Sequence, residues 1–143
     1  MATMGDLGRR IVAGEVEHPP VCRLVGMVAT HIEPGRCVFE LQVDQRHHNP
    51  MGTLHGGIYC DLADAAMGMA YAATLAEGES FTTLELKINF FRPLRQGKLV
   101  AEARLVNAGR TQGYLECDVR DEQGRLMARA ASTCLKFAPA QAG

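Results

Sequence analysis

Residues 46–75 read RHHNPMGTLHGGIYCDLADAAMGMAYAATL, and we expect the rest of the chain to be built around this stretch. It begins as a loop of polar and turn-forming residues and passes through Gly56-Gly57 into an apolar run over residues 58–76. Apolar side chains occupy every side of a helical wheel in this run, which predicts a helix buried on all sides. Such a helix would be roughly 30 Å long, the diameter of a small domain.

Two aspartates, Asp61 and Asp64, interrupt the apolar run. A carboxylate buried without partners is costly, so each aspartate must be hydrogen-bonded, exposed near the helix start or used in chemistry. Two acids in so short a segment also argue against a membrane span, and no membrane partner is expected.

Composition places the chain among ordinary globular proteins. It has 143 residues, 47% hydrophobic and 22% charged, enough for one domain with a sizeable core. A net charge of −1 without any run of Lys and Arg argues against nucleic-acid binding. The first residues, MATMGDLGRR, lack the apolar core of a secretory signal, so a cytoplasmic protein is expected.

Cysteines and histidines do not form a recognisable metal site. The five cysteines are odd in number and show no C-x-x-C spacing, which favours buried reduced thiols over disulfides or zinc ligands. They are Cys22, Cys37, Cys60, Cys117 and Cys134. The histidines His47, His48 and His55 complete no H-E-x-x-H or Cys/His set, so no metal is expected.

The remaining segments predict a short N-terminal helix and an antiparallel sheet. Residues 5–17 fit an amphipathic helix, and alternating runs over 22–31 and 36–43 around Glu33-Pro34-Gly35 fit a hairpin. Four further strands are expected over 81–91, 98–107, 113–120 and 126–137, joined in order as a meander. One sheet cannot hide a helix that is apolar on all sides, so a second copy of the chain is expected to cover the rest.

The strand over residues 81–91 is expected to alternate without interruption. One face would then carry Thr82, Leu84, Leu86, Ile88 and Phe90. The opposite face would carry Thr83, Glu85, Lys87 and Asn89.

The start of the helix is the first candidate for chemistry. Unpaired N–H groups at a helix N-terminus can stabilise a negative oxygen, and Gly56 has no Cβ to obstruct a ligand. From spacing alone, a tight loop-to-helix junction is the better explanation of both glycines, because a single Gly-Gly pair is a weak signal. Asp64 follows Gly56 by eight residues, roughly 12 Å along a helix, too far to share a substrate atom within one chain. Two antiparallel helices could bring Asp64 of one chain to Gly56 of another.

Other candidate residues have ordinary structural explanations. Asp64 could be a hydrogen-bonded helix carboxylate, Asn49 a turn residue before Pro50, and Thr83 a common strand residue. No G-x-S-x-G elbow is present, which disfavours a serine hydrolase. The sequence also has no phosphate-binding loop and no dinucleotide fingerprint.

The pattern Asn49-x-x-Gly52-x-x-His55-Gly56-Gly57, with Asp64 nine residues after His55, resembles the signature of hotdog-fold acyl-CoA thioesterases of the phenylacetate-pathway (PaaI-like) type. The strand over 83–93 and the Gly109-Arg110-Thr111 turn resemble further blocks of that family. The similarity covers about residues 20–137.

The resemblance implies an α+β hotdog fold, in which a curved antiparallel sheet wraps a long central helix, with a short N-terminal helix here. It divides the chain into an N-terminal helical segment (1–19), a hotdog domain (20–138) and a tail (139–143). It also implies homodimers with active sites at the subunit interface, assembled into homotetramers.

The family's catalytic roles transfer to matching residues. Asp64 would act as nucleophile or general base, the Gly56 N–H as oxyanion donor, and Thr83, from the same chain as Asp64, would position water. Asn49 would hold the substrate carbonyl or water, and His55 would orient the loop or the thioester; both would come from the opposite chain, with Gly56.

Further positions would bind the substrate. These are Gly57, Gly109, Arg110 and Thr111. Arg110 would contact a phosphate of the nucleotide, although a solvated turn arginine is the alternative.

The expected function is hydrolysis of an aromatic or medium-chain acyl-CoA to the free acid and CoA. A thiolate leaves readily, so a base and an oxyanion site suffice and no cofactor is expected. The alternatives are a hotdog dehydratase acting on hydroxyacyl thioesters and a non-catalytic acyl-CoA-binding domain.

Overall fold

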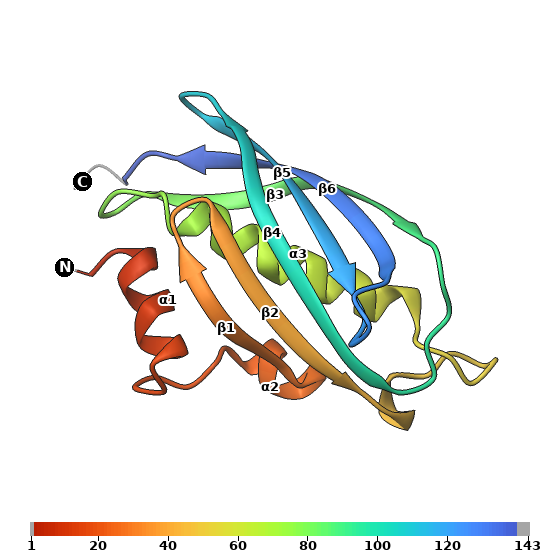
Figure 1. The fold of residues 1–143 in the computed structure, drawn as a ribbon. Helices are drawn as coiled ribbons and strands as arrows, with labels where there is room; N and C mark the ends of the chain where they lie inside the picture. The colour runs from red at the N-terminus through yellow and green to blue at the C-terminus, as the bar shows by residue number, and fades with distance from the viewer. Residues whose placement is uncertain (1, 140–143) are drawn as a thin grey trace.

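In the computed structural model, which describes residues 2–139, a curved six-stranded sheet wraps one long helix (Figure 1). The helices are α1 (Met4–Val12), α2 (Pro20–Val25), the 3-10 helix η1 (Gln45–His47) and α3 (Gly56–Ala72). The strands are β1 (Met27–Glu33), β2 (Arg36–Val43), β3 (Ser80–Phe90), β4 (Gly97–Ala108), β5 (Gln112–Arg120) and β6 (Leu126–Phe137). The α+β hotdog fold and its short N-terminal helix are thereby confirmed. Of the tail expected at 139–143, residues 140–143 lie outside the described part.

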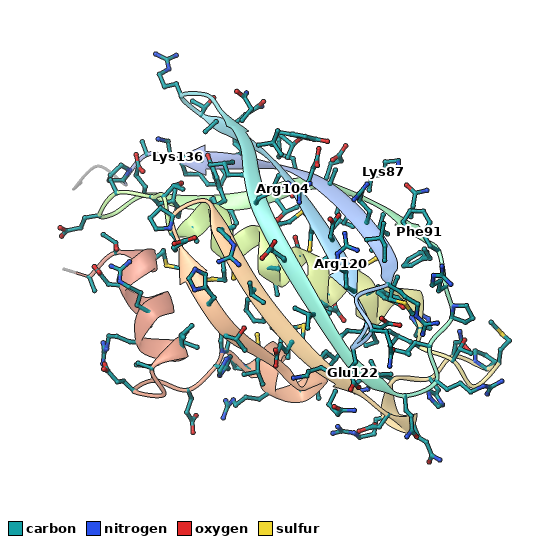
Figure 2. The ribbon with its side chains drawn as sticks, viewed as in Figure 1. Lys87, Phe91, Arg104, Arg120, Glu122 and Lys136 are labelled. Atoms are coloured by element: carbon teal, nitrogen blue, oxygen red, sulfur yellow. The ribbon has the colours of Figure 1, made fainter. Side chains whose placement is uncertain are left out.

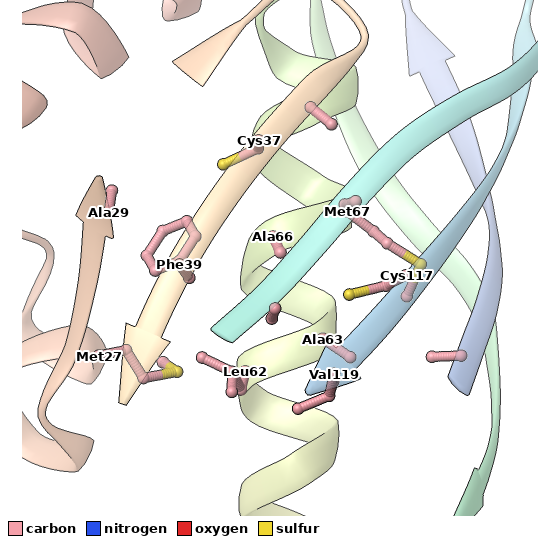
Figure 3. Close-up of a cluster of buried hydrophobic side chains, with 14 of the residues drawn as sticks. Met27, Ala29, Cys37, Phe39, Leu62, Ala63, Ala66, Met67, Cys117 and Val119 are labelled. Atoms are coloured by element: carbon pink, nitrogen blue, oxygen red, sulfur yellow. The ribbon is translucent and has the colours of Figure 1, made fainter. Parts of the chain in front are cut away.

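The core lies between α3 and the concave face of the sheet. Leu62, Ala66 and Met67 of α3 are fully buried, and Figure 3 shows them beside Phe39 and Val119 of the sheet. Alanines along this side of the helix allow the strands to approach closely. The prediction of burial on every side is wrong for a single chain, because Asp61 and Asp64 are exposed on α3.

The strand order is β1-β2-β4-β5-β6-β3, with all neighbours antiparallel. The predicted meander is correct for β4, β5 and β6 but wrong for β3, which pairs with β6 at the far edge of the sheet. The chain crosses the concave face as α3 after β2, so β3 starts on the opposite side, and β4 returns to pair with β2. The edge strands are therefore β1 and β3.

The N-terminal elements differ in detail from the prediction. The first helix ends at Val12 and is capped by Thr3, whose hydroxyl accepts from Asp6 N–H. The strand expected from residue 22 begins only at Met27, because residues 20–25 form α2. Pro20 suits the first position of a helix, and Gly26 ends α2 with a φ of 93° that favours glycine.

A bulge in β3 overturns the predicted alternation of that strand. The pairing of β3 with β6 shifts register between Thr83 and Glu85. A single extra residue reverses the side on which every later side chain lies. As a result Thr83 faces inward with Phe81, whereas Leu84 points outward and is 53% exposed.

The outer face of the sheet carries many charged side chains. Figure 2 shows Lys87, Arg104 and Arg120 on this face. Arg104 pairs with Glu116 at 2.9 Å, between cross-strand neighbours of β4 and β5. Such exposed pairs contribute little to stability, and they keep this face solvated.

Two expectations from composition bear on this fold. No helix among residues 2–139 is long and apolar enough to cross a membrane. All five cysteines are free thiols, four of them buried, although Cys22 lies in α2 rather than in a strand.

We expect Met67→Ala to lower the free energy of unfolding by about 2–5 kcal/mol, because it leaves a cavity in the core between α3 and the sheet. Leu24→Ala is the control, since Leu24 is 82% exposed and its loss should cost less than about 0.5 kcal/mol. Urea unfolding of both variants measures the difference. Equal losses would show that α3 is not packed as described.

Candidate active site

Asp64 and Thr83 meet on the side of α3 near the edge strand β3. The Thr83 hydroxyl donates a hydrogen bond to Asp64 Oδ1 at 3.0 Å. No residue in the described part of the chain hydrogen-bonds Asp64 Oδ2, so this oxygen is free to act on a ligand. Asp64 and Thr83 of one chain are thus in direct contact, and their joint role in a site stays a prediction.

Both residues line an apolar cavity of about 240 Å³. Its walls come from α1, α2, α3 and both edge strands, which bend toward each other around the helix. The apolar lining includes Ile11, Val21, Ile32, Phe39, Met69 and Phe81. The cavity can therefore hold an apolar group beside a carboxylate.

The cavity also contains one polar residue that the sequence analysis missed. His18 lines it, and its Nε2 accepts a hydrogen bond from the backbone N–H of Ala29 on β1 at 2.9 Å. This bond ties the connection between α1 and α2 to the edge of the sheet. No spacing in the sequence links residue 18 to residues 64 and 83, so only the fold could identify it.

The loop before α3 is organised by Asn49. Its Oδ1 accepts from the N–H groups of Met51 and Thr53 at 2.9 and 3.1 Å, and its Nδ2 donates to Thr53 Oγ1 at 2.9 Å. These bonds hold the turn around Gly52. The side chain of Asn49 is thus engaged within its own loop.

At the start of α3, His55 caps the helix. Its Nδ1 accepts from Gly57 N–H at 2.8 Å, so the proton of the ring lies on Nε2. The N–H of Gly56 has no acceptor among residues 2–139. A Cβ on Gly56 would lie 3.0 Å from Cζ of Phe90, so the ring covers this turn closely.

Within one chain these groups do not share the cavity of Asp64. Asn49 and Gly56 line a separate groove with Phe90, Phe91 and Pro93. Another shallow groove contains His55 and Gly57, together with Arg46 and Asp61. The structure thus joins Asp64 to Thr83 but leaves the donor groups at the helix start apart from them.

Asp61 lies one turn before Asp64 and differs from it in surroundings. Partial burial, and then the nearby Asp64 charge, raise the pKa of Asp61. No hydroxyl donates to it in the described structure, so Asp64 is the better-held carboxylate of the two.

The turn between β4 and β5 carries the other predicted binding residues. Gly109 N–H donates to Gln112 O at 2.7 Å, and Thr111 O accepts from Lys136 N–H at 2.7 Å. Arg110 is exposed, and none of the three lines the cavity of Asp64. Their role in binding stays a prediction.

Residues 2–139 contain no group of three or more His, Cys, Asp or Glu residues that could hold a metal ion. The histidines of the loop have structural partners. His47 Nε2 donates to Val25 O at 2.7 Å, and His48 Nε2 donates to Arg95 O at 2.6 Å.

Comparison with known proteins gives a consistent family. Residues 51–128 match the model of the Thioesterase superfamily, a span that contains the helix start, Asp64 and Thr83. The chain is 37% identical over 125 residues to the proofreading thioesterase EntH of Klebsiella pneumoniae, covering 87% of this chain and 90% of the relative. It is 26% identical to acyl-coenzyme A thioesterase 13 of Homo sapiens, over 93% of this chain and 96% of the relative.

A solved structure extends the similarity to the fold. A phenylacetic acid degradation-related protein from Ralstonia eutropha superposes with a TM-score of 0.81 at 30% identity, over 90% of this chain and 98% of that one. The resemblance seen in the sequence is confirmed. The chain belongs to the Thioesterase superfamily, among the PaaI-like hotdog thioesterases, and is a thioester hydrolase.

Proposed function

We propose that this thioesterase hydrolyses aromatic or medium-chain acyl-CoA, with Asp64 as general base or nucleophile. The observation that carries the proposal is the Asp64 carboxylate, held by the Thr83 hydroxyl at 3.0 Å in the wall of an apolar cavity. An acyl chain in the cavity would bring its thioester carbonyl to that carboxylate.

Two routes fit this arrangement. As a general base, Asp64 would take a proton from water through its free Oδ2 while the water oxygen attacks the carbonyl carbon. As a nucleophile, Oδ2 would attack the carbon directly and form an anhydride that water then cleaves. In both routes the C–S bond breaks as the tetrahedral intermediate collapses, and the CoA thiolate leaves and takes up a proton.

The developing oxyanion needs a donor, and we assign this role to the Gly56 N–H of a second copy. That N–H lacks an acceptor within residues 2–139 and stands at the positive end of α3. The ring of His55, held by the N–H of Gly57, offers a further donor at Nε2 in the neighbouring groove. Asn49 then acts by holding the loop rather than by touching the substrate.

A homodimer would bring these two halves together. The strand β3 has 11 residues and pairs with β6 on one side only, so its other edge offers free backbone groups. The exposed side of α3, with Asp61 and Asp64, lies next to this edge. Antiparallel association along β3 and α3 would place the helix start of one chain near Asp64 of the other, and two such dimers would form the tetramer.

The volume of the cavity supports the choice of acyl group. A cavity of about 150 Å³ holds benzene, so 240 Å³ leaves room for a substituted ring or a medium chain. A long acyl chain would extend beyond the cavity and expose some of its methylene groups to water. The solvated turn at Gly109, Arg110 and Thr111 is assigned to the nucleotide part of CoA.

The dehydratase alternative requires a histidine free to act as a base. His55 Nδ1 already accepts from Gly57 N–H, and its Nε2 carries the proton, so the ring is set as a donor. This observation disfavours the dehydratase. The paired Asp64 and Thr83 in the cavity wall disfavour a purely binding domain.

Asp64→Asn should lower kcat by about 10²- to 10⁴-fold, because the amide can act neither as base nor as nucleophile. Release of free thiol from phenylacetyl-CoA, hydroxybenzoyl-CoA and hexanoyl-CoA measures the loss. Asp61→Asn is the matched control one turn earlier on α3 and should retain most activity. Loss in Asp61→Asn instead would transfer the role to that carboxylate.

Gly56→Pro tests the oxyanion donor, because proline removes the N–H at a helix position that it otherwise favours. His55 has ψ of 135°, which is compatible with a following proline. We expect kcat to fall by about 10²- to 10³-fold. Gly56→Ala keeps the N–H and adds a Cβ near Phe90, as proline also does, so any loss in Gly56→Pro beyond that of Gly56→Ala is due to the N–H.

The same two variants test whether each site uses two chains. Exchange of subunits between Asp64→Asn and Gly56→Pro protein in equal amounts would make half of the dimers mixed, each with one intact site. About a quarter of wild-type activity should then return. Failure to recover activity after verified subunit exchange would place both groups of a site on one chain.

The volume of the cavity predicts that turnover falls for long acyl chains. We expect kcat/KM for palmitoyl-CoA to be at least about tenfold below that for hexanoyl-CoA. Met69→Ala enlarges the cavity and should shift the preference toward longer chains, whereas Met51→Ala, at a side chain 71% exposed, should not. An unchanged length profile in Met69→Ala would mean that the acyl group binds elsewhere.

A further inference from the structure

A buried thiol lies behind Thr83. Cys134 of β6 is the cross-strand partner of Thr83, just before the bulge of β3. Its Sγ lies 3.9 Å from Thr83 Oγ1, and its side chain is fully buried. The three groups thus form a row from the core to the cavity: Cys134, Thr83, Asp64.

The chemistry of these groups fixes the direction of both hydrogen bonds. An ionised carboxylate can only accept, so the single hydroxyl proton of Thr83 goes to Asp64. At its other contact the Thr83 oxygen can then only accept, so a hydrogen bond between the two groups is donated by the thiol, which also has the Ser132 hydroxyl as a neighbour. Burial raises the pKa of the Cys134 thiol, which keeps its proton in place at neutral pH.

We propose that Cys134 is a positioning residue, which orients the Thr83 hydroxyl toward Asp64 by donating S–H to Thr83 Oγ1. The proposal rests on the proposed function of Asp64. A threonine hydroxyl can otherwise rotate to other acceptors or exchange places with the methyl group. The donor from the core favours the one rotamer in which Asp64 receives the proton, and Oδ2 stays free for the substrate.

Other buried thiols of the sheet lack this arrangement. Cys37 on β2 is equally buried, but no hydroxyl contacts it in the described part of the chain. Cys117 on β5 contacts only the backbone carbonyl of Asp118, at 3.9 Å. Cys37 therefore serves as a control for removal of a buried thiol on the same face.

The test compares Cys134→Val, which loses the donor and adds a methyl group, with Cys134→Ser, which keeps a donor; Cys37→Val controls for the added methyl group at another buried position. We expect Cys134→Val to lower kcat by about two- to fivefold with KM unchanged, the range expected of a weak S–H···O bond. Cys134→Ser should restore part of kcat, because its shorter Cβ–O bond places the hydroxyl farther from Thr83 Oγ1 than the thiol. Cys37→Val should leave kcat unchanged.

A double-mutant cycle separates positioning from general loosening of the structure. Thr83→Val removes the hydroxyl through which Cys134 acts, so adding Cys134→Val to it should cause no further loss. Additive losses, or equal kcat in wild type, Cys134→Val and Cys134→Ser, would overturn the proposal. Thermal melting of all variants shows whether they remain folded.

A readout without turnover distinguishes this proposal from the proposed function. Three-bond NMR couplings to the Thr83 methyl report its χ1 rotamer in the free protein. One rotamer is expected in wild type, rotamer averaging in Cys134→Val, and a smaller degree of averaging in Cys134→Ser. A single unchanged rotamer in all three proteins would refute the positioning role, whereas rotamer averaging in a protein with no thioesterase activity would refute only the proposed reaction.

Discussion

The structure depends on the need to cover α3, a helix with apolar side chains around most of its circumference. The hydrophobic effect makes each exposed apolar side costly, and one flat sheet could cover only one side of a helix. The sheet therefore curves until its edge strands, β1 and β3, lie on either side of the helix. Alanines such as Ala63 and Ala66 permit this close approach, since a larger side chain would push the strands away.

The candidate active site lies where the sheet leaves α3 uncovered. The N-terminal segment closes part of the gap with Ile11 and Val21, but their packing against Met69 and Phe81 is incomplete and leaves a cavity. A carboxylate in its wall would be destabilised without a partner. The bulge of β3 supplies that partner, since it turns Thr83 inward at the level of Asp64. The bulge of the edge strand β3 thus affects both how the strand packs against α3 and how Asp64 is hydrogen-bonded.

The sequence predicted features that depend on local pattern and missed those that depend on distant contacts. The central helix, the hairpin around Pro34 and the N-terminal helix follow from periodicity and turn chemistry. Asp64 and Thr83 were singled out by the family resemblance of the helix signature and of the strand over 83–93. Periodicity could not show that β3 crosses to β6, because either pairing buries the same face. The bulge at Leu84 could not be predicted either, because residues 83–86 (T-L-E-L) alternate between polar and apolar side chains without interruption. His18 was missed because its partner is the backbone N–H of Ala29 on β1, and no sequence pattern reveals such a contact.

The loop before α3 shows why residue type alone does not define a role. Asn49 was expected to hold the substrate carbonyl or water, and that role stays a prediction; in the structure its amide also bonds within the loop and fixes the path of the chain into Gly56. His47 links this loop to the cavity wall: its backbone O accepts from His55 N–H at 2.9 Å, and its ring donates to Val25 O of α2. These two hydrogen bonds tie the loop before α3 to α2, whose residues Val21 and Cys22 line the cavity of Asp64.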